Sequence, residues 1–213
     1  MSKLEIYWSF RSPYSYLAID RLSQIATDYD IETAFCFVRP LAMREPDFFE
    51  RNRPQWLPYL FKDMMRESQR LGVAFALPRP DPIIMDLVTG KVDPDQPLMT
   101  RLMGLGVAAQ ETARAGLGFA RAVSHRIWGG VADWHEGDHL GEAAREAGLD
   151  LAALEVWADE NPGRIAEVIE VNETAQFAHH WGVPLMVLDD EPYFGQDRLT
   201  SLVWRLDQKG LKK

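Results

Sequence analysis

The sequence predicts an α/β fold in which a large all-helical segment interrupts a small sheet. A strand, a helix and a second strand follow one another within residues 1–38, and a helix, two short strands and a last helix occupy residues 163–213. Between them, residues 39–162 lack strand patterns and show helical ones. We therefore expect residues 1–38 and 163–213 to form one domain, with residues 39–162 as an inserted helical domain.

The N-terminal unit has the pattern of two strands joined by a helix. Residues 4–10 alternate and are aromatic-rich, and residues 31–38 are rich in β-branched and aromatic types. Between them, apolar residues recur at helical spacing. Ser12 followed by Pro13 is a helix-start signal, because serine caps free N–H groups and proline has none to lose. A strand–helix–strand unit has a right-handed crossover, so parallel strands are expected.

The middle of the chain predicts helices separated by a proline-rich loop. Helical patterns cover residues 56–71, 96–128 as one long helix or two, 141–147 and 151–160. Residues 77–97 hold five prolines. This segment is expected to run over the surface or over a site.

The C-terminal unit predicts a helix, a hairpin and a final helix. A helix from residue 162 or 163 to 180 precedes short strands at 185–188 and 192–194, which flank an acidic turn and indicate an antiparallel hairpin. Asp197 is expected to cap the final helix, which runs to Leu206. The complete order is that of a thioredoxin-like fold with a large all-helical domain inserted after the second strand.

Composition argues against several classes of partner. The 213 residues include 32 acidic and 23 basic ones, and the net charge of -9 disfavours nucleic acid and anionic lipid. No segment has the roughly 20 apolar residues of a membrane helix. No signal-peptide pattern opens the sequence, so a cytoplasmic protein is expected.

The residues that most often bind metals are sparse. Cys36 is the only cysteine, which allows no internal disulfide and no cysteine-rich metal site, and its apolar neighbours indicate a small buried residue. His135 and His139 would share a helical face, but Gly137 between them weakens a helix and no third ligand suggests itself. No metal is expected.

Two blocks of sequence carry a resemblance to a known family. They are Ser9-Phe10-Arg11-Ser12-Pro13-Tyr14-Ser15-Tyr16-Leu17-Ala18, and Gly182-Val183-Pro184 followed by Glu191-Pro192-Tyr193-Phe194-Gly195-Gln196-Asp197-Arg198-Leu199. The chain resembles 2-hydroxychromene-2-carboxylate isomerases and the related kappa-class glutathione transferases, within the wider DsbA-like group. Asn52-Arg53-Pro54, Lys62-Asp63-Met64 and Trp134-His135-Glu136-Gly137-Asp138 also resemble family positions.

The resemblance implies glutathione as cofactor or co-substrate. Ser12 stands where redox relatives carry their reactive cysteine, and a hydrogen bond from its hydroxyl would stabilise the thiolate of glutathione. Val183, before a cis Pro184, is expected to pair with the backbone of the tripeptide. The other ligands that the resemblance implies are Asn52, Lys62, Gln196, Asp197 and Arg198.

Simpler structural roles remain open for these residues. Ser12 and Asp197 can be plain helix caps, and Pro184 can be a trans proline that starts a strand. Asn52 lies in a polar turn and Lys62 on a helix, where solvated side chains are common. The sequence also departs from the family pattern, since the usual lysine-glycine pair is missing near Lys62 and residues 81–116 form a longer stretch. We expect that stretch to lie near the mouth of the Ser12 site.

Three functions of different classes follow. The leading one is a glutathione-dependent isomerase or transferase that acts on an aromatic-derived electrophile by reversible addition of the glutathione thiolate, as a homodimer like its relatives. A thiol–disulfide oxidoreductase is disfavoured, because Ser12 and Ser15 occupy the positions of the two cysteines. A non-catalytic binder of glutathione or another thiol ligand stays open, because the lysine-glycine pair is missing.

Overall fold

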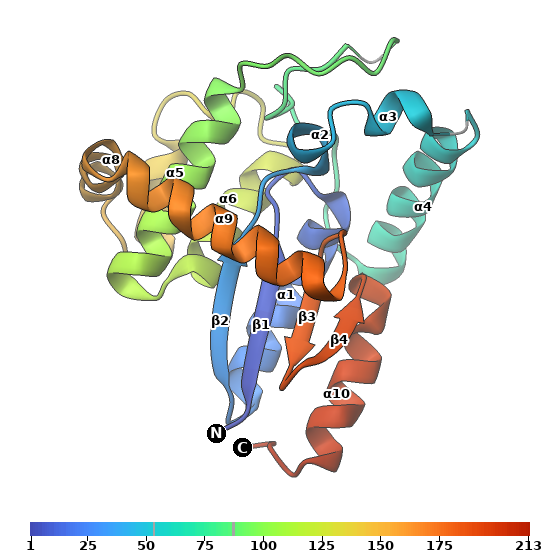
Figure 1. Cartoon of the computed structure of the whole chain (residues 1–213), viewed down its shortest axis with the longest axis vertical. Coiled ribbons are helices and arrows are strands. Elements are labelled where there is room, and N and C mark those ends of the chain that lie inside the picture. The colour runs from blue at the N-terminus through green and yellow to red at the C-terminus, as the bar shows by residue number, and fades with distance from the viewer. Residues whose placement is uncertain (53, 87) are drawn as a thin grey trace.

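The computed structural model describes residues 1–52, 54–86 and 88–213, and its elements follow the predicted order (Figure 1). Arg53, from the segment Asn52-Arg53-Pro54, lies outside the described residues. The elements in chain order are β1 (Lys3–Trp8), α1 (Pro13–Asp28), β2 (Glu32–Phe37), α2 (Leu41–Arg44), α3 (Phe48–Arg51), α4 (Trp56–Leu71), α5 (Pro97–Ala113), α6 (Gly116–Trp128), α7 (His139–Glu146), α8 (Leu151–Glu160), α9 (Pro162–His179), β3 (Leu185–Leu188), β4 (Glu191–Phe194), the 3₁₀ helix η1 (Gln196–Arg198) and α10 (Leu199–Gln208).

The four strands form one mixed sheet in the order β2-β1-β3-β4. β1 and β2 are parallel, with Lys3 opposite Glu32 and Trp8 opposite Phe37, as the crossover rule predicts. β3 is antiparallel to β1, and β4 is antiparallel to β3, so the predicted hairpin is confirmed. With the helices between β2 and α9, the predicted thioredoxin-like fold with a helical insertion is confirmed.

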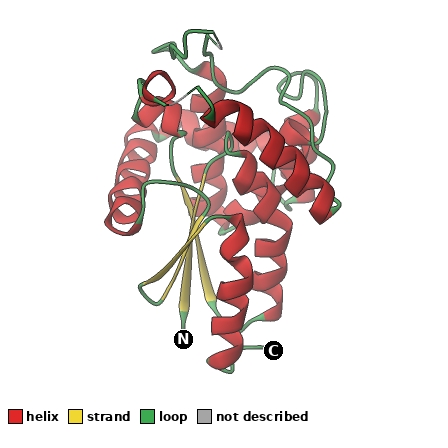
Figure 2. Cartoon of the chain, turned by 90° about the vertical axis from the view of Figure 1, so that its right-hand side faces the viewer, coloured by secondary structure: helices red, strands yellow, loops and turns green. Residues whose placement is uncertain are grey.

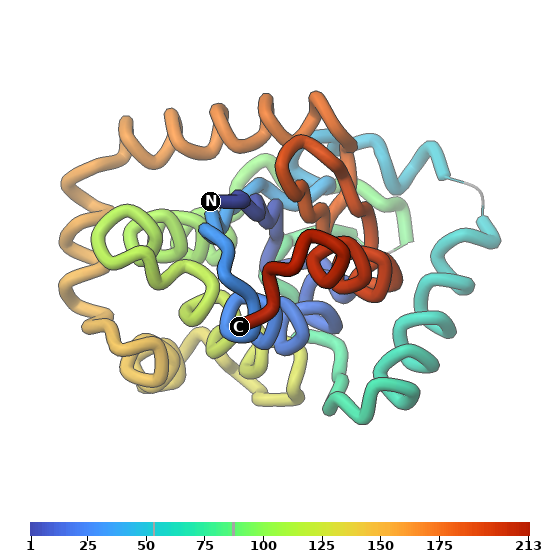
Figure 3. Tube along the Cα trace, turned by 90° about the horizontal axis from the view of Figure 1, so that it is seen from below, coloured from blue at the N-terminus to red at the C-terminus, as the bar shows by residue number. Residues whose placement is uncertain are grey.

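Alternation along the strands divides the apolar residues between the two faces of the sheet. Leu4, Ile6 and Trp8 of β1 belong to the large core, whereas Tyr7 belongs to a smaller cluster with Val38 and residues of β3. α1 and α10 lie on one face of the sheet, and α9 crosses the other (Figures 1 and 3).

The inserted helices share the large core with the sheet. Gly106 of α5 lies so close to β2 that a Cβ there would be 2.7 Å from Cε1 of Phe37, which leaves room only for glycine. Phe119 of α6 packs edge-on against Phe10 at 6.4 Å between ring centroids. The helices gather at the end of the sheet opposite the N-terminus, where β1 leads into α1 (Figure 2). The division into two domains stays a prediction.

The structure settles one boundary that the sequence left open and adds two short helices. The helical pattern over residues 96–128 is two helices, α5 and α6, separated where Arg114 has a φ of 53°. The four-residue helices α2 and α3 were not predicted, because so short a segment shows no periodicity. None of the helices in the described ranges is long and apolar enough to cross a membrane.

Candidate functional site

An open cavity of about 360 Å³ lies where β1 leads into α1. Its wall combines Ser9 and residues 11–14 with residues of α2, α3 and α4 and with residues 181–183 before β3. Most of the aromatic residues of this wall come from the insertion, and one comes from the hairpin. The aromatic residues that line the wall are Tyr14, Phe48, Phe49, Trp56, Tyr59, Trp181 and Phe194.

Ser12 caps α1 at the edge of this cavity. Its φ and ψ are -87° and 115°, and Pro13 is the first helical residue, as predicted. The Ser12 Oγ accepts a hydrogen bond from the backbone N–H of Ser15 at 3.2 Å and lies 3.5 Å from the carbonyl oxygen of Val183, to which it can donate. The hydroxyl therefore stands between the positive end of a helix and the loop before β3.

The structure brings Val183 and Pro184 to Ser12 from 171 residues away in the sequence. The peptide bond between them is cis, as the resemblance implies. Val183 lines the cavity, and the carbonyl of Pro184 accepts a bond of 2.9 Å from the N–H of Gly195. That bond ties the loop to the end of β4.

Two rings of the cavity wall next to Val183, those of Trp181 and Phe194, lie close to the ring of His180. The ring of His180 lies 3.7 Å from that of Phe194 and 5.3 Å from that of Trp181, nearly parallel to both. The His180 Nδ1 accepts a hydrogen bond of 2.9 Å from the N–H of Gly182. Burial lowers the pKa of His180, so the neutral ring is favoured at pH 7. Flat walls of this kind suit a planar ligand.

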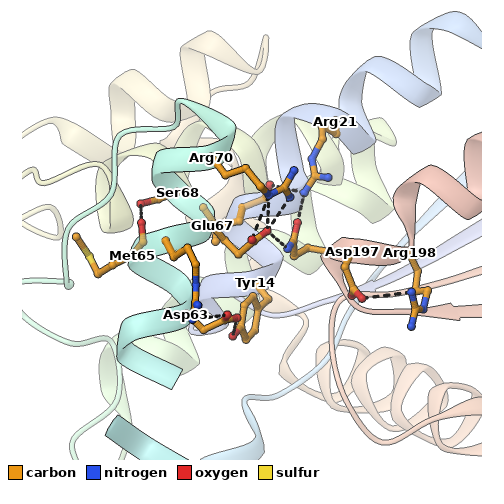
Figure 4. Close-up of polar contacts among 12 residues, drawn as sticks. Tyr14, Arg21, Asp63, Met65, Glu67, Ser68, Arg70, Asp197 and Arg198 are labelled. Atoms are coloured by element: carbon orange, nitrogen blue, oxygen red, sulfur yellow. Dashed lines mark hydrogen bonds and ion pairs between the residues drawn. The ribbon is translucent and has the colours of Figure 1, made fainter. Parts of the chain in front are cut away.

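Tyr14 adds a hydroxyl to the wall next to Ser12. It donates a 2.6 Å hydrogen bond to Asp63 of α4. Burial, and the carboxylate of Asp63, raise the pKa of the Tyr14 phenol, so it stays protonated. The bond joins the first turn of α1 to α4 (Figure 4).

Two arginines complete the lining of the cavity. The Arg11 Nε and Nη2 bind Asp81 at 3.2 and 2.9 Å, and the Arg11 guanidinium lies over the ring of Phe49. Arg44, at the end of α2, donates to the Oε1 of Gln176 at 3.0 Å and to the carbonyl of Trp181 at 3.1 Å. Burial lowers the pKa of Arg44, although a guanidinium stays charged.

Gln196 is buried away from the wall of the cavity, in a polar cluster between α1, α4 and η1. Its Oε1 accepts from Arg21, and its Nε2 donates to Glu67 at 2.7 Å. Glu67 is also paired with Arg70 at 2.6 Å. Figure 4 shows Arg21, Glu67 and Arg70 converging between the two helices. The side chain of Gln196 is thus fully used in holding three elements together.

Asp197 and Arg198 lie in η1, outside the residues that line the cavity, and both are exposed. Their side chains pair with each other at 3.4 Å (Figure 4). The prediction that Asp197 caps the last helix is wrong. The chain leaves β4 through Gly195, with a φ of 100°, and makes a 3₁₀ turn before α10, so Asp197 lies inside that turn and Arg198 occupies the cap position.

Asn52 and Lys62 are also outside the cavity lining. The Nδ2 of Asn52 donates to the carbonyl of Phe48, which closes the end of α3. Lys62 is exposed on α4. Of the residues implied as ligands, the structure brings Ser12, Val183 and Pro184 together, and it does not bring Asn52, Lys62, Gln196, Asp197 or Arg198 into the lining of the cavity.

Residues 81–116 contribute less to the site than expected. None of the described residues in this stretch lines the cavity, although Asp81 binds Arg11 of its wall and Gly90 lies against Phe49 of its wall. α5 packs instead against α6, α8, α9 and β2. The part of the insertion that shapes the cavity is residues 40–60, which follow β2 directly.

The site has no thiol of its own among the described residues that line it. Ser12 and Ser15 stand at the two positions of a redox motif, and the Ser15 side chain is fully buried. Cys36 is in β2, and burial raises the pKa of its thiol to about 12, so it stays protonated.

The sequence did not indicate Arg44 or Trp181 as site residues. Arg44 lies in a four-residue helix without periodicity, and it reaches the cavity only because α2 follows β2 at the same end of the sheet. Trp181 stands directly before the Gly182-Val183-Pro184 block, which was the available signal.

Comparison with known proteins agrees with this geometry. Residues 3–207 match the family model of the DSBA-like thioredoxin domain. The chain belongs to this family. The DsbA-like form of the fold, with its helical insertion, is thereby confirmed.

Two relatives of the chain are named as isomerases. The chain is 26% identical to the 2-hydroxychromene-2-carboxylate isomerase of Pseudomonas putida, over 93% of this chain and 91% of that protein. It is 27% identical to the isomerase of the same name from Sphingobium xenophagum, over 93% and 95%. A solved structure of 2-hydroxychromene-2-carboxylate isomerase superposes with a TM-score of 0.70 and 23% identity, covering 97% of this chain and 95% of that one. The predicted resemblance is confirmed.

Proposed function

We propose that this DSBA-like protein isomerises an aromatic-derived carboxylate, as the names of its isomerase relatives suggest, and that it uses glutathione to do so. The observation that carries the proposal is the pairing of Ser12 with the Val183 carbonyl, at 3.5 Å, in the wall of an aromatic cavity. In that place a serine can hold a thiolate that the protein does not itself supply.

The backbone before Pro184 suits an extended peptide ligand. Within the described part of the chain the N–H of Val183 has no acceptor, and its carbonyl receives only the long bond from Ser12. An N–H and a C=O left free on one residue can pair with a tripeptide as a neighbouring strand does. Val183 and Ser12 would therefore hold the central part of glutathione, while Asp197 and Arg198 would meet its charged γ-glutamyl end.

The division of chemistry follows from these residues. Bound glutathione would supply a thiolate that adds reversibly to an electron-poor carbon, which permits rotation about a former double bond. Ser12 would donate its hydrogen bond to that sulfur, beside the positive end of the α1 dipole. Trp56, Trp181 and Phe194 would orient a planar substrate and exclude water.

A glutathione binder without catalysis is the second candidate. The side-chain amide of Asn52 donates a hydrogen bond to the carbonyl of Phe48, and Lys62 is exposed on α4 outside the cavity lining. A site with fewer ligands than its relatives could keep the tripeptide and lose the reaction.

The test is the isomerisation of 2-hydroxychromene-2-carboxylate, followed by ultraviolet absorbance with no thiol, with glutathione or with S-methylglutathione. We expect the protein to accelerate isomerisation only with glutathione, since the S-methyl compound has no free thiol. Equal acceleration without glutathione would refute the dependence. Binding of glutathione, measured by calorimetry, without acceleration of this or related electrophiles would establish the second candidate.

A further inference from the structure

The two arginines in the cavity wall differ in how their charges are balanced. Arg11 meets both oxygens of Asp81, at 3.2 and 2.9 Å, and its guanidinium also covers the ring of Phe49. A bidentate pair of this kind neutralises the cation and fixes its plane. Arg11 therefore has little charge to offer a ligand.

Arg44 has only neutral acceptors. Its two bonds go to the amide oxygen of Gln176 and to the carbonyl of Trp181, and its Nε is buried without a partner in the described part of the chain. The two nearby carboxylates are already engaged: Glu45 binds Arg51 at 2.7 Å, and Glu173 binds Arg39 at 2.6 Å. Within the described ranges Arg44 forms no ion pair, and Glu45 and Glu173, which act on its charge only through space, each contact another arginine.

The position of Arg44 is fixed by a buried amide. Gln176 of α9 is fully buried, and its Nε2 donates to the carbonyl of Gly182 at 2.7 Å, so its Oε1 faces Arg44. The guanidinium is thus held against the same loop that carries Val183. A partly buried cation held in one place without a counter-charge is a ready-made anion site.

We infer that Arg44 binds the carboxylate of the ligand in this cavity and thereby selects acids over their neutral analogues. The rings of Phe48, Phe49 and Trp181 beside it would accept a flat apolar body joined to that carboxylate. The identity of the ligand rests on the proposed function, because both an aromatic acid and the glycine end of glutathione carry a carboxylate.

Calorimetric titration with two matched pairs of ligands tests the inference. The first pair is 2-naphthoate and 2-naphthamide, and the second is glutathione and its glycine amide. In the unaltered protein one acid should bind about 10- to 100-fold more tightly than its amide, the effect of a charged hydrogen bond of about 1.5–3 kcal/mol. Arg44→Gln should reduce that ratio to less than about threefold, and Arg44→Lys, which keeps the charge but not the fork that binds Gln176 and Trp181, should give an intermediate ratio.

The double variant Arg11→Gln/Asp81→Asn is the control, since it removes a neutral pair from the same wall and should leave the ratio unchanged. A preference confined to the naphthoate pair places an aromatic acid at Arg44, and one confined to glutathione places its glycine end there. The inference is overturned if the unaltered protein prefers neither acid, or if Arg44→Gln weakens acid and amide equally. Failure of glutathione to bind, with the naphthoate preference intact, would count against the proposed function and not against Arg44.

Discussion

Ser12 can cap the helix and hydrogen-bond a thiolate at the same time, because the first role uses its hydroxyl oxygen and the second its hydroxyl hydrogen. Its oxygen accepts from the N–H of Ser15, while its hydrogen is directed at the Val183 carbonyl 3.5 Å away. A hydrogen bond of that length is weak and is readily exchanged for one to an anion. The structural and functional roles considered for this residue are therefore compatible.

Asp189 offers a test of a single charge far from the site. It forms the turn between β3 and β4, where it binds Lys209 at 2.7 Å and accepts from the backbone N–H of Lys3 at 2.8 Å. These contacts, the one with Lys209 first, lower the pKa of Asp189 from 3.8 to about 2. A carboxylate whose pKa is lower in the folded than in the unfolded protein stabilises the fold at pH values above its unfolded-state pKa. The stabilisation is lost as the pH falls through the folded-state pKa.

We predict that Asp189→Asn lowers the free energy of unfolding by about 1 kcal/mol at pH 6, the scale of a surface ion pair. Asparagine keeps the turn, since it tolerates the φ of 47° at this position. Urea unfolding should show the difference shrinking between pH 4 and pH 2. A constant difference over that range would mean that the charge of Asp189 is not responsible.

At the scale of elements, the polar cluster around Gln196 joins α1, α4 and η1. Arg21 comes from α1, Glu67 from α4 and Gln196 from η1. α4 buries few side chains, chiefly Met64 and Ser68. This cluster and the Tyr14–Asp63 bond therefore set the position of α4, and with it one wall of the cavity.

We predict that Gln196→Ala lowers the free energy of unfolding by about 1–3 kcal/mol, because it removes the hydrogen bonds of Gln196 to Arg21 and Glu67.

Asp197→Ala, at an exposed position in the same turn, should change the free energy of unfolding by less than about 0.5 kcal/mol. It should instead weaken glutathione binding by about 1.5–3 kcal/mol through loss of a charged bond to the ammonium group. Chemical denaturation and calorimetry measure the two effects. Equal loss of affinity for glutathione and for an analogue without the amino group would assign Asp197 to the turn alone.

Most elements could be predicted from local patterns, and the errors share a cause. The bounds of α4 and α8 coincide with the periodic segments, and the cap of α1 follows from Ser12 and Pro13. The prediction that Asp197 caps the last helix fails because the role of this residue depends on how the chain turns after Gly195. A capping residue and a residue inside a 3₁₀ turn have the same local sequence signal.

At the scale of the whole molecule, the site is made by topology. Parallel β1 and β2 both end at the side where α1 begins, so Ser12 and the segment after β2 meet there. The resemblance supplied Ser12, Val183 and Pro184, but Arg44 depends on contacts with Gln176 and Trp181, 132 and 137 residues away, and the ring stack depends on the hairpin that returns Phe194 to His180. No local pattern contains that information.

We predict that the protein is a homodimer in solution, a proposal that rests on its isomerase-like relatives. Light scattering after size exclusion should give twice the 24.3 kDa of one chain at micromolar concentration. A mass of one chain at that concentration would refute the prediction. Such a result would leave the proposed chemistry intact, because every residue assigned to the cavity comes from a single chain.

The pKa of the glutathione thiol bound to the protein is the measurement closest to the central claim. Thiolate absorbance in the ultraviolet, followed against pH, should show a pKa below that of free glutathione. Ser12→Ala should raise it towards the free value with only a modest loss of affinity. Ser15→Ala is the matched control, because it removes a fully buried hydroxyl without a partner in the described part of the chain. A bound thiol pKa that is the same in Ser12→Ala as in the unaltered protein would contradict the role given to Ser12.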